Sequence, residues 1–460
     1  MNTKMIRYIL CRMLGVESVL LMIPVIVAAL YQEMSGIAFL IPAGILLLLF
    51  FLAGVKKPEQ SHIYGKEGMV IVALAWFGAM PFTISGFIPN YMDAFFETVS
   101  GFTTTGSSIL RDVEALPQCL LFWRSLTHWI GGMGVLVFVL VLTSLDKKNS
   151  MYLMRAEVPG PEKDKLVPKA MSTARILYGM YLIMTVVEII FLMLGGVNLF
   201  DSMIFSFGSA GTGGFSNYAD SVAHFHSAYI DGVIKTFCAL FGVNFSLFYF
   251  MLLGDFKSVR KNEELRTYIM LIVGATALIT LNIHSMFPSM IKAFRYAIFQ
   301  VVTVITTTGY ATTDFAKWPM FSTGGGIKVS RLLVGIKCIK REIVQLAHPK
   351  SVGIIRIGGK KVGSDILRTI YIYFIAYVGI LIVSVMLVSL DNFDFETTFS
   401  AVLTTLGNVG PGMAKVGPMG NFADFSILSK LVLCFDMLAG RLEIFPFLVL
   451  FTAPAWRRKF

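Results

Sequence analysis

The feature that most constrains this chain is a short apolar segment that ends in threonines and a glycine, and that occurs four times. The segment FETVSGFTTTG (96–106) aligns without a gap on FQVVTVITTTG (299–309). A Gly-richer copy is FSFGSAGTGG (205–214), and a more divergent one is SAVLTTLGNVGPG (400–412). The candidate final glycines are separated by 107, 96 and 101 residues: Gly106, Gly213, Gly309 and Gly410. A steady period of this kind indicates a repeated structural unit.

Each copy is expected to change along its length from helix to extended backbone. In the first, Asp93 is a candidate N-cap and the apolar residues after it predict a short helix. The β-branched run Thr103–Thr105 then favours an extended strand that leads to Gly106, because glycine enters unusual backbone conformations easily. Irregular backbone at membrane depth is tolerated only where it is buried in protein or lines a water-filled path. A half-helix with its negative end toward a cavity, followed by a strand of carbonyl oxygens, suits a cation that loses its hydration shell.

The composition is that of a membrane protein and excludes most soluble classes. Hydrophobic residues make up 56% of the chain and charged residues only 15%, whereas a soluble domain is about 25% charged. The five cysteines have no metal-type spacing, so the sequence predicts neither a disulfide framework nor a zinc site. Basic residues near the start lead into an apolar run without a cleavage site, which favours a first span over a removed signal peptide. We expect spans at residues 6–31, 35–55, 67–89, 117–143, 172–197, 225–254, 267–288, 364–391 and 425–455.

The net charge of +11 is explained by orientation rather than by nucleic-acid binding. Lysine and arginine concentrate in alternate connections, with about thirty of the 39 on the side that holds both termini. By the positive-inside rule both termini are cytoplasmic, and the four threonine–glycine motifs lie toward the outside of the cytoplasmic membrane. Anionic lipid is the expected secondary contact of these basic clusters, and nucleic acid is not an expected partner.

The predicted fold is an all-α polytopic membrane protein with an N-terminal two-helix hairpin and four repeats. The hairpin covers residues 1–66, and the repeats cover 67–171, 172–266, 267–363 and 364–460. The third repeat is anomalous, because Trp318 to Lys328 is only ten residues, about 15 Å as a helix. Crossing the bilayer as a helix takes about 20 apolar residues. We therefore predict that the outer part of the third inner helix is absent.

Several polar residues fall within the predicted spans. Arg124 and His128 lie one turn apart and are expected near the outer interface, where a cationic head reaches water. Asn244, in a Gly-Val-Asn sequence, is expected to line the bundle interior. Arg441 has two interpretations, a pore-facing guanidinium that repels cations or an interhelical salt bridge. Asp436 lies off its i±3 and i±4 face, which favours the first.

Together these motifs resemble the landmarks of a known family. In order, SGFTTTGSSI, FWRSLTHWIGGMGVLVF, AGTGGFS, TTTGYATTDFAKWP, STGGGIKV, GNVGPG and AGRLEIFP resemble those of the Trk/Ktr/HKT superfamily of potassium transporters. The N-terminal hairpin looks most like the TrkH branch of bacterial Trk systems. The resemblance implies membrane–pore-loop–membrane repeats in pseudo-fourfold order around one pore, in a homodimer. It implies potassium uptake across the cell inner membrane, of the symport type, by a protein without enzymatic activity.

The resemblance also assigns residues and partners. A cytosolic nucleotide-binding ring, similar to TrkA, is implied as the gating partner. Potassium at the filter carbonyls is the implied transported ion and the sole metal, with no covalent cofactor. The implied gate consists of an intramembrane loop and an arginine barrier: Gly324, Gly325, Gly326, Lys328 and Arg441. The implied selectivity filter comprises Thr103, Thr104, Thr105 and Gly106; Ala210, Gly211, Thr212 and Gly213; Thr306, Thr307, Thr308 and Gly309; and Gly407, Asn408, Val409 and Gly410.

Two other functions compete with this one. A non-conducting membrane scaffold, or an inactive variant, is favoured by the short third inner helix. A membrane enzyme is disfavoured because no nucleophile–base pair or metal-ligand spacing is evident. Residues 324–328 also lack the GxxxxGK[ST] spacing of a phosphate-binding loop.

Overall fold

The structure is a computed structural model and is almost entirely α-helical. It describes residues 3–55, 86–88, 90–132, 170–315, 318, 329–348, 353–357, 360–442 and 444–448. Within these ranges the single sheet has two short antiparallel strands, β1 (Arg356–Ile357) and β2 (Lys360–Lys361). The predicted all-α fold is confirmed.

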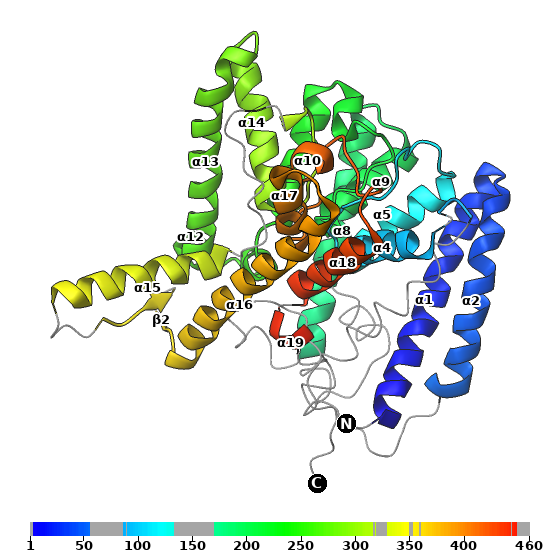
Figure 1. Ribbon diagram of the computed structural model, residues 1–460, viewed down its shortest axis with the longest axis horizontal. Helices are drawn as coiled ribbons and strands as arrows, with labels where there is room; N and C mark the ends of the chain where they lie inside the picture. The colour runs from blue at the N-terminus through cyan, green and yellow to red at the C-terminus, as the bar shows by residue number, and fades with distance from the viewer. Residues whose placement is uncertain are drawn as a thin grey trace.

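The N-terminal hairpin is present as expected. Helices α1 (Thr3–Tyr31) and α2 (Ile37–Leu49) lie side by side at one flank of the molecule (Figure 1). The short 3₁₀ turn Met34–Gly36 joins them. A β-carbon on Gly36 would lie 2.5 Å from the β-carbon of Ala28, so glycine permits the close packing of the turn on α1. The hairpin also contacts α5 (Gln118–Gly132), which attaches it to the first repeat.

Four short helices correspond to the four sequence repeats. They are α4 (Tyr91–Phe102), α9 (Leu199–Gly211), α14 (Met290–Ile305) and α17 (Phe395–Leu406). Each begins at a residue whose side chain accepts a hydrogen bond from a backbone N–H of the first turn, which satisfies an otherwise unpaired donor. These N-caps are Asn90, Asn198, Ser289 and Asp394. Asp93 is therefore not the cap of the first helix.

Longer apolar helices surround the short ones. Five segments are long and apolar enough to cross a membrane: Leu14–Tyr31, Met34–Leu52, Arg175–Leu194, Glu263–Met286 and Ile366–Asp391. The first two belong to α1 and to α2 with its flanking turns, and the third lies within α8 (Ala170–Leu194). The last two are α13 (Glu263–Ile283) and α16 (Ser364–Val388), each with the turn that follows it. Figure 1 shows α13 at the flank opposite to the hairpin.

The predicted span 225–254 is not one straight helix. It divides into α10 (Ala228–Phe241) and α11 (Phe245–Leu252), which are bent by 90°. Asn244 caps α11 by accepting from the Ser246 N–H, and it is exposed. The expectation that Asn244 lines the bundle interior is wrong, because its amide serves the new helix start.

The remaining helices complete the fourth repeat and the cytoplasmic connections predicted from charge. The fourth repeat ends with α18 (Ile427–Arg441) and α19 (Ile444–Leu448). The connections contain α12 (Phe256–Lys261) and α15 (Val329–Ala347). The segment between Trp318 and α15, on which the prediction of an absent helix depends, lies outside the described residues, as does most of the predicted span 67–89.

The hydrophobic cores connect the repeats rather than separating them. The largest joins the first repeat to the fourth, for example Phe96 to Leu433. Another joins the second repeat to the third, through Phe205 and Phe299. Shared cores fix the short helices around a common centre.

Candidate ion pathway

The four short helices end in the same backbone turn. In each, the residue after the turn donates its N–H to a carbonyl five residues earlier, with N···O distances of 2.7–2.9 Å. The pairs are Thr105 to Ser100, Gly213 to Gly208, Thr308 to Thr303, and Val409 to Thr404. The residue before each donor is left-handed, with φ between +50° and +59°: Thr104, Thr212, Thr307 and Asn408. Left-handed non-glycine residues are uncommon, so this shared geometry defines the register of the four copies.

The register corrects one predicted segment. The glycine that follows the turn has positive φ, between +76° and +94°, and is Gly106, Gly214, Gly309 or Gly410. In the second copy this residue is Gly214, not Gly213, so the segment Ala210–Gly213 is one residue early. The error arose because three glycines lie within four residues there. We define filter copies 1 to 4 as Thr103–Gly106, Gly211–Gly214, Thr306–Gly309 and Gly407–Gly410.

The four copies form a closed ring. A β-carbon on Gly106 would lie 2.0 Å from the carbonyl oxygen of Gly213 in copy 2. The other contacts run from Gly214 to the Thr308 oxygen at 2.0 Å, from Gly309 to the Val409 oxygen at 2.2 Å, and from Gly410 to the Thr105 oxygen at 2.6 Å. Each glycine thus abuts a carbonyl of the next copy, and copy 4 returns to copy 1. Side chains are excluded at all four positions by both space and φ.

A cavity of about 100 Å³ borders the ring. Its lining includes all four positive-φ glycines of the ring, together with small polar residues such as Ser107, Ser108 and Ser216. Arg124 is the charged residue among its described lining. The cavity therefore lies on the side of the ring formed by the four glycines and the residues that directly follow them in the chain.

Arg124 joins filter copies 1 and 2 rather than reaching bulk water. Its side chain is 6% exposed and forms a salt bridge of 2.7 Å with Glu97, which is 1% exposed. The guanidinium also donates to the Ser216 carbonyl and lies 4.0 Å from the Phe215 ring centre. Glu97 in turn accepts the Ile109 N–H. The predicted interfacial position of Arg124 is wrong because Glu97, on α4, supplies a buried partner that the sequence pattern did not reveal.

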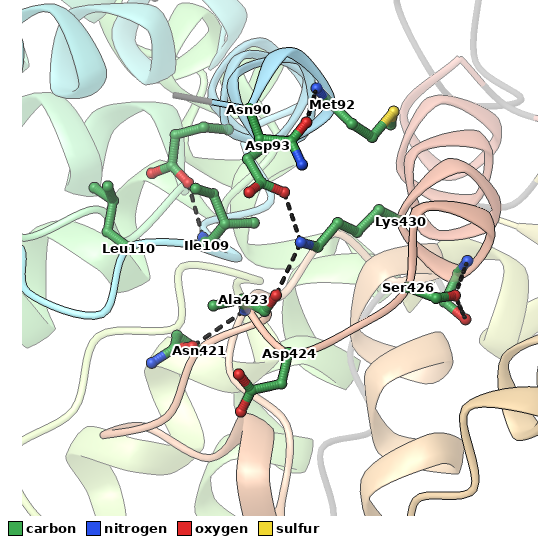
Figure 2. Close-up of polar contacts among 12 residues, drawn as sticks. Asn90, Met92, Asp93, Ile109, Leu110, Asn421, Ala423, Asp424, Ser426 and Lys430 are labelled. Carbon is green, nitrogen blue, oxygen red and sulfur yellow. Dashed lines mark hydrogen bonds and ion pairs between the residues drawn. The ribbon is translucent and has the colours of Figure 1, made fainter. Parts of the chain in front are cut away.

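A second, partly buried ion pair joins copies 1 and 4. Figure 2 shows Lys430 of α18 between Asp93 and the Ala423 carbonyl, with Nζ–O distances of 2.5 and 2.9 Å. The Lys430 side chain is 6% exposed. Asp93 is thus an ion-pair partner in the first turn of α4, and Asn90 beside it provides the cap (Figure 2).

Side-chain support differs between the copies. In copies 1 and 3 two threonine hydroxyls bond each other, Thr103 to Thr105 at 2.7 Å and Thr306 to Thr308 at 2.9 Å. In copy 4 the Asn408 amide donates to the Thr105 hydroxyl and to the Met437 carbonyl, both at 2.9 Å. Copy 2 has glycine at both of the positions that carry threonine in copies 1 and 3.

Arg441 lies against two glycines at the C-terminal end of α5, the helix that follows filter copy 1. Its guanidinium donates to the carbonyl oxygens of Gly131 and Gly132, the latter at 3.0 Å. A β-carbon on Gly132 would lie 2.6 Å from the Gly211 α-carbon, which places this group next to filter copy 2. Asp436 instead accepts the Ser384 hydroxyl at 2.8 Å. The predicted gate residues Gly324, Gly325, Gly326 and Lys328 lie outside the described residues.

Comparison with known proteins decides the family. A sequence model of the TrkH family, described as a cation transport protein, matches residues 69–457. The chain is 35% identical to the Trk system potassium uptake protein TrkH of Salmonella typhimurium, over 95% of this chain and 96% of that protein. This chain belongs to the TrkH family. Its fold matches the crystal structure of the potassium transporter TrkH from Vibrio parahaemolyticus with a TM-score of 0.88, at 30% identity over 99% of this chain and 100% of that one.

TrkH-family membership confirms the resemblance found in the sequence. The Vibrio parahaemolyticus Trk system potassium uptake protein TrkH is 33% identical over 97% of both chains, so the similarity extends across all four repeats. The chain is a multi-pass membrane protein of this fold. Among the residues described, no three His, Cys, Asp or Glu side chains gather as metal ligands.

Proposed function

We propose that this TrkH-family chain takes up potassium through a channel-like pore, with the ring of filter copies 1 to 4 as its selectivity filter. The observation that supports this most strongly is ring closure, in which each positive-φ glycine abuts a carbonyl of the next copy. Backbone carbonyls in a ring replace the hydration shell of a potassium ion. Potassium at these carbonyls is the transported ion, and we propose no catalytic step or bound cofactor.

The short helices supply electrostatic support for a cation. Each of α4, α9, α14 and α17 ends immediately before or within its filter copy. The C-terminal end of a helix carries a partial negative charge from its unpaired carbonyls. Four such ends converge on one ring, which favours an incompletely hydrated cation there.

Among the described residues, the proposed gate is Arg441, which is not among the residues that line the cavity. Arg441, held by the Gly131 and Gly132 carbonyls, is the positive barrier in this proposal. The loop at Gly324–Lys328 is the movable element, controlled by a cytosolic nucleotide-binding ring similar to TrkA. We further propose a homodimer in the cytoplasmic membrane with both termini inside, on the basis of the basic-residue distribution and the family resemblance.

Growth and flux measurements test the uptake proposal. The chain is expressed in bacteria that lack their own potassium uptake systems, and growth is followed at limiting potassium. Purified protein in liposomes then reports potassium and sodium flux directly. Potassium-dependent growth and a potassium flux that exceeds the sodium flux are expected. Correctly inserted protein that gives neither would contradict the proposal.

The short third repeat supports a second candidate function. Lys328 lies only ten positions after Trp318, fewer than a full inner helix needs. A non-conducting scaffold of the same fold would then bind its partners without passing ions. Inserting about 20 apolar residues after Phe321 distinguishes the two: recovery of uptake by the insertion alone supports an inactive parent chain, whereas normal uptake by the parent excludes it.

A further inference from the structure

His128 is a buried side chain that the pathway described above does not use. It lies on α5 with 0% exposure. Neither ring nitrogen meets hydrogen-bond geometry with any described residue, although the Gly101 carbonyl lies nearby. The ring packs instead on Phe215, with centroids 4.1 Å apart. Among the described residues, the closest contacts of this buried imidazole are therefore packing contacts, with Phe215 and with the backbone of filter copy 2.

The imidazole occupies the space behind filter copy 2. A β-carbon on Gly213 would lie 2.0 Å from His128 Nδ1 and 2.3 Å from its Cγ. In copies 1 and 3 the residues equivalent to Gly213 are Thr105 and Thr308, as the shared turn hydrogen bonds show. The His128 ring therefore fills, from a neighbouring helix, the volume that a threonine side chain fills in those copies.

In the next repeat the larger side chain is on the filter copy and the smaller one is on the helix behind it. Gly132 of α5 faces copy 2, and Gly242 after α10 faces copy 3, where its β-carbon would lie 2.5 Å from Thr306 Cγ2. Four residues before Gly242 is Cys238, whose thiol lies beside the Thr308 hydroxyl. A small inner-helix residue thus meets a threonine in copy 3, and a large one meets a glycine in copy 2.

We propose that His128 is a positioning residue for filter copy 2, which sets the place of that strand in the ring and thereby the discrimination between potassium and sodium. The packing part stands on the contacts of His128 alone, and the selectivity part rests on the proposed potassium uptake. Copy 2 has glycine at positions 211 and 213, where copies 1 and 3 have threonine, so at those two positions it has no side chain of its own to pack against α5. Because copy 2 contacts copy 1 through Gly213 and copy 3 through Gly214, its displacement alters the whole aperture.

A double-mutant cycle between positions 128 and 213 tests the proposal in the full-length protein. His128→Cys leaves a void behind copy 2, and Gly213→Thr overpacks it against the imidazole. Gly213 does not have positive φ, so threonine is compatible with its backbone. The combination H128C/G213T recreates the cysteine–threonine pair of copy 3. Each single variant is expected to lose a few degrees of unfolding temperature and part of its potassium-over-sodium uptake ratio, and the double variant to recover much of both.

Gly179→Thr is the control for a glycine-to-threonine change that meets no neighbour, because a β-carbon there, within α8, has nothing within 4 Å. Losses that simply add in the double variant would overturn the packing role of His128. Recovery of unfolding temperature without recovery of the ion ratio would overturn its role in selectivity. If the parent passes no potassium, the proposed uptake fails, and the coupling in unfolding temperature still decides the packing role.

Discussion

Filter copies 1 and 2 adopt the same backbone turn with opposite means of support. Copy 1 carries its own side chains, and the Thr103 and Thr105 hydroxyls bond each other behind the strand. Copy 2 has glycines at those positions, and its Gly213 packs against the His128 ring of α5. The turn hydrogen bond and the left-handed residue are nevertheless the same in both. The difference teaches that the backbone geometry, rather than the threonines, is the common property of the four copies.

The largest expected loss of stability comes from breaking the Arg124–Glu97 salt bridge between copies 1 and 2. Arg124→Ala removes the cation from a buried salt bridge and leaves Glu97 as an uncompensated buried charge. Breaking such a pair typically costs about 3–5 kcal/mol, so we expect a large loss of thermal stability in detergent. Arg111→Ala is the matched control, because its pair with Asp424 is 75% and 62% exposed and is worth less than about 1 kcal/mol. Similar losses in both variants would refute the role of Arg124 at this junction.

The next effect concerns the contact between the same two copies at the ring. Gly106→Ser introduces a β-carbon 2.0 Å from the Gly213 oxygen, at a φ of +83°. Copy 2 must move away, and we expect the potassium-over-sodium uptake ratio to fall by about tenfold, which corresponds to about 1.4 kcal/mol. Total ion uptake should fall less. An unchanged ratio in liposome flux would remove Gly106 from the filter.

A smaller effect distinguishes the self-supported copies from copy 2. Thr103→Val and Thr306→Val each remove one hydroxyl of a bonded pair, at a typical cost of about 0.5–1.5 kcal/mol. We expect similar losses in thermal unfolding, because each removed hydroxyl lies 2.7–2.9 Å from its partner hydroxyl and also donates to the carbonyl four residues earlier. Thr236→Val is the control, since its hydroxyl bonds only its own helix at an exposed position. A strongly unequal response would show that copies 1 and 3 are not supported alike.

The smallest effect is a pH dependence confined to copy 4. Hydrogen bonds from the Thr397 hydroxyl and N–H hold the pKa of Asp394 below its ordinary value. The group therefore contributes stability above its unfolded pKa, and this contribution is lost as the pH falls through the folded pKa. Asp394→Asn should remove that dependence in unfolding curves between about pH 5 and pH 2, and because Asp394 is exposed to solvent, screening keeps the cost below about 0.5 kcal/mol. The cap of the helix before copy 1 is Asn90, which does not titrate. The control Asn90→Ser should therefore leave the pH dependence of unfolding unchanged.

Much of the fold followed from the sequence because its signals are local and repeated. The apolar segments, the positive-inside pattern and the four threonine–glycine motifs each depend on residues close together in the chain. The register of copy 2 did not follow, because Gly211, Gly213 and Gly214 all satisfy the motif. Its backbone hydrogen bond, from Gly213 to Gly208, is what selects Gly214 as the residue of positive φ.

The parts that could not be predicted depend on contacts across the chain. The Lys430–Asp93 pair joins residues 337 positions apart, and Arg124 finds Glu97 on a different helix. Either carboxylate could equally have been a helix cap or a solvated side chain. The bend after Phe241 was missed because Gly-Val-Asn is compatible with a continuous helix, and the Asn244 cap is visible only once the new helix start is known.

The closed ring has a consequence for how such a protein varies. A filter built from four identical chains changes at four places with every mutation. Here each mutation changes a side chain in one copy only and reaches the other copies through the contacts of that copy with its two neighbours. Substitutions at equivalent positions should therefore give graded changes in ion preference, and each quarter can diverge on its own. The ring already contains three different arrangements: a bonded threonine pair in copy 1, glycines packed against His128 in copy 2, and an asparagine amide in copy 4. Such divergence is possible because a mutation changes one copy at a time.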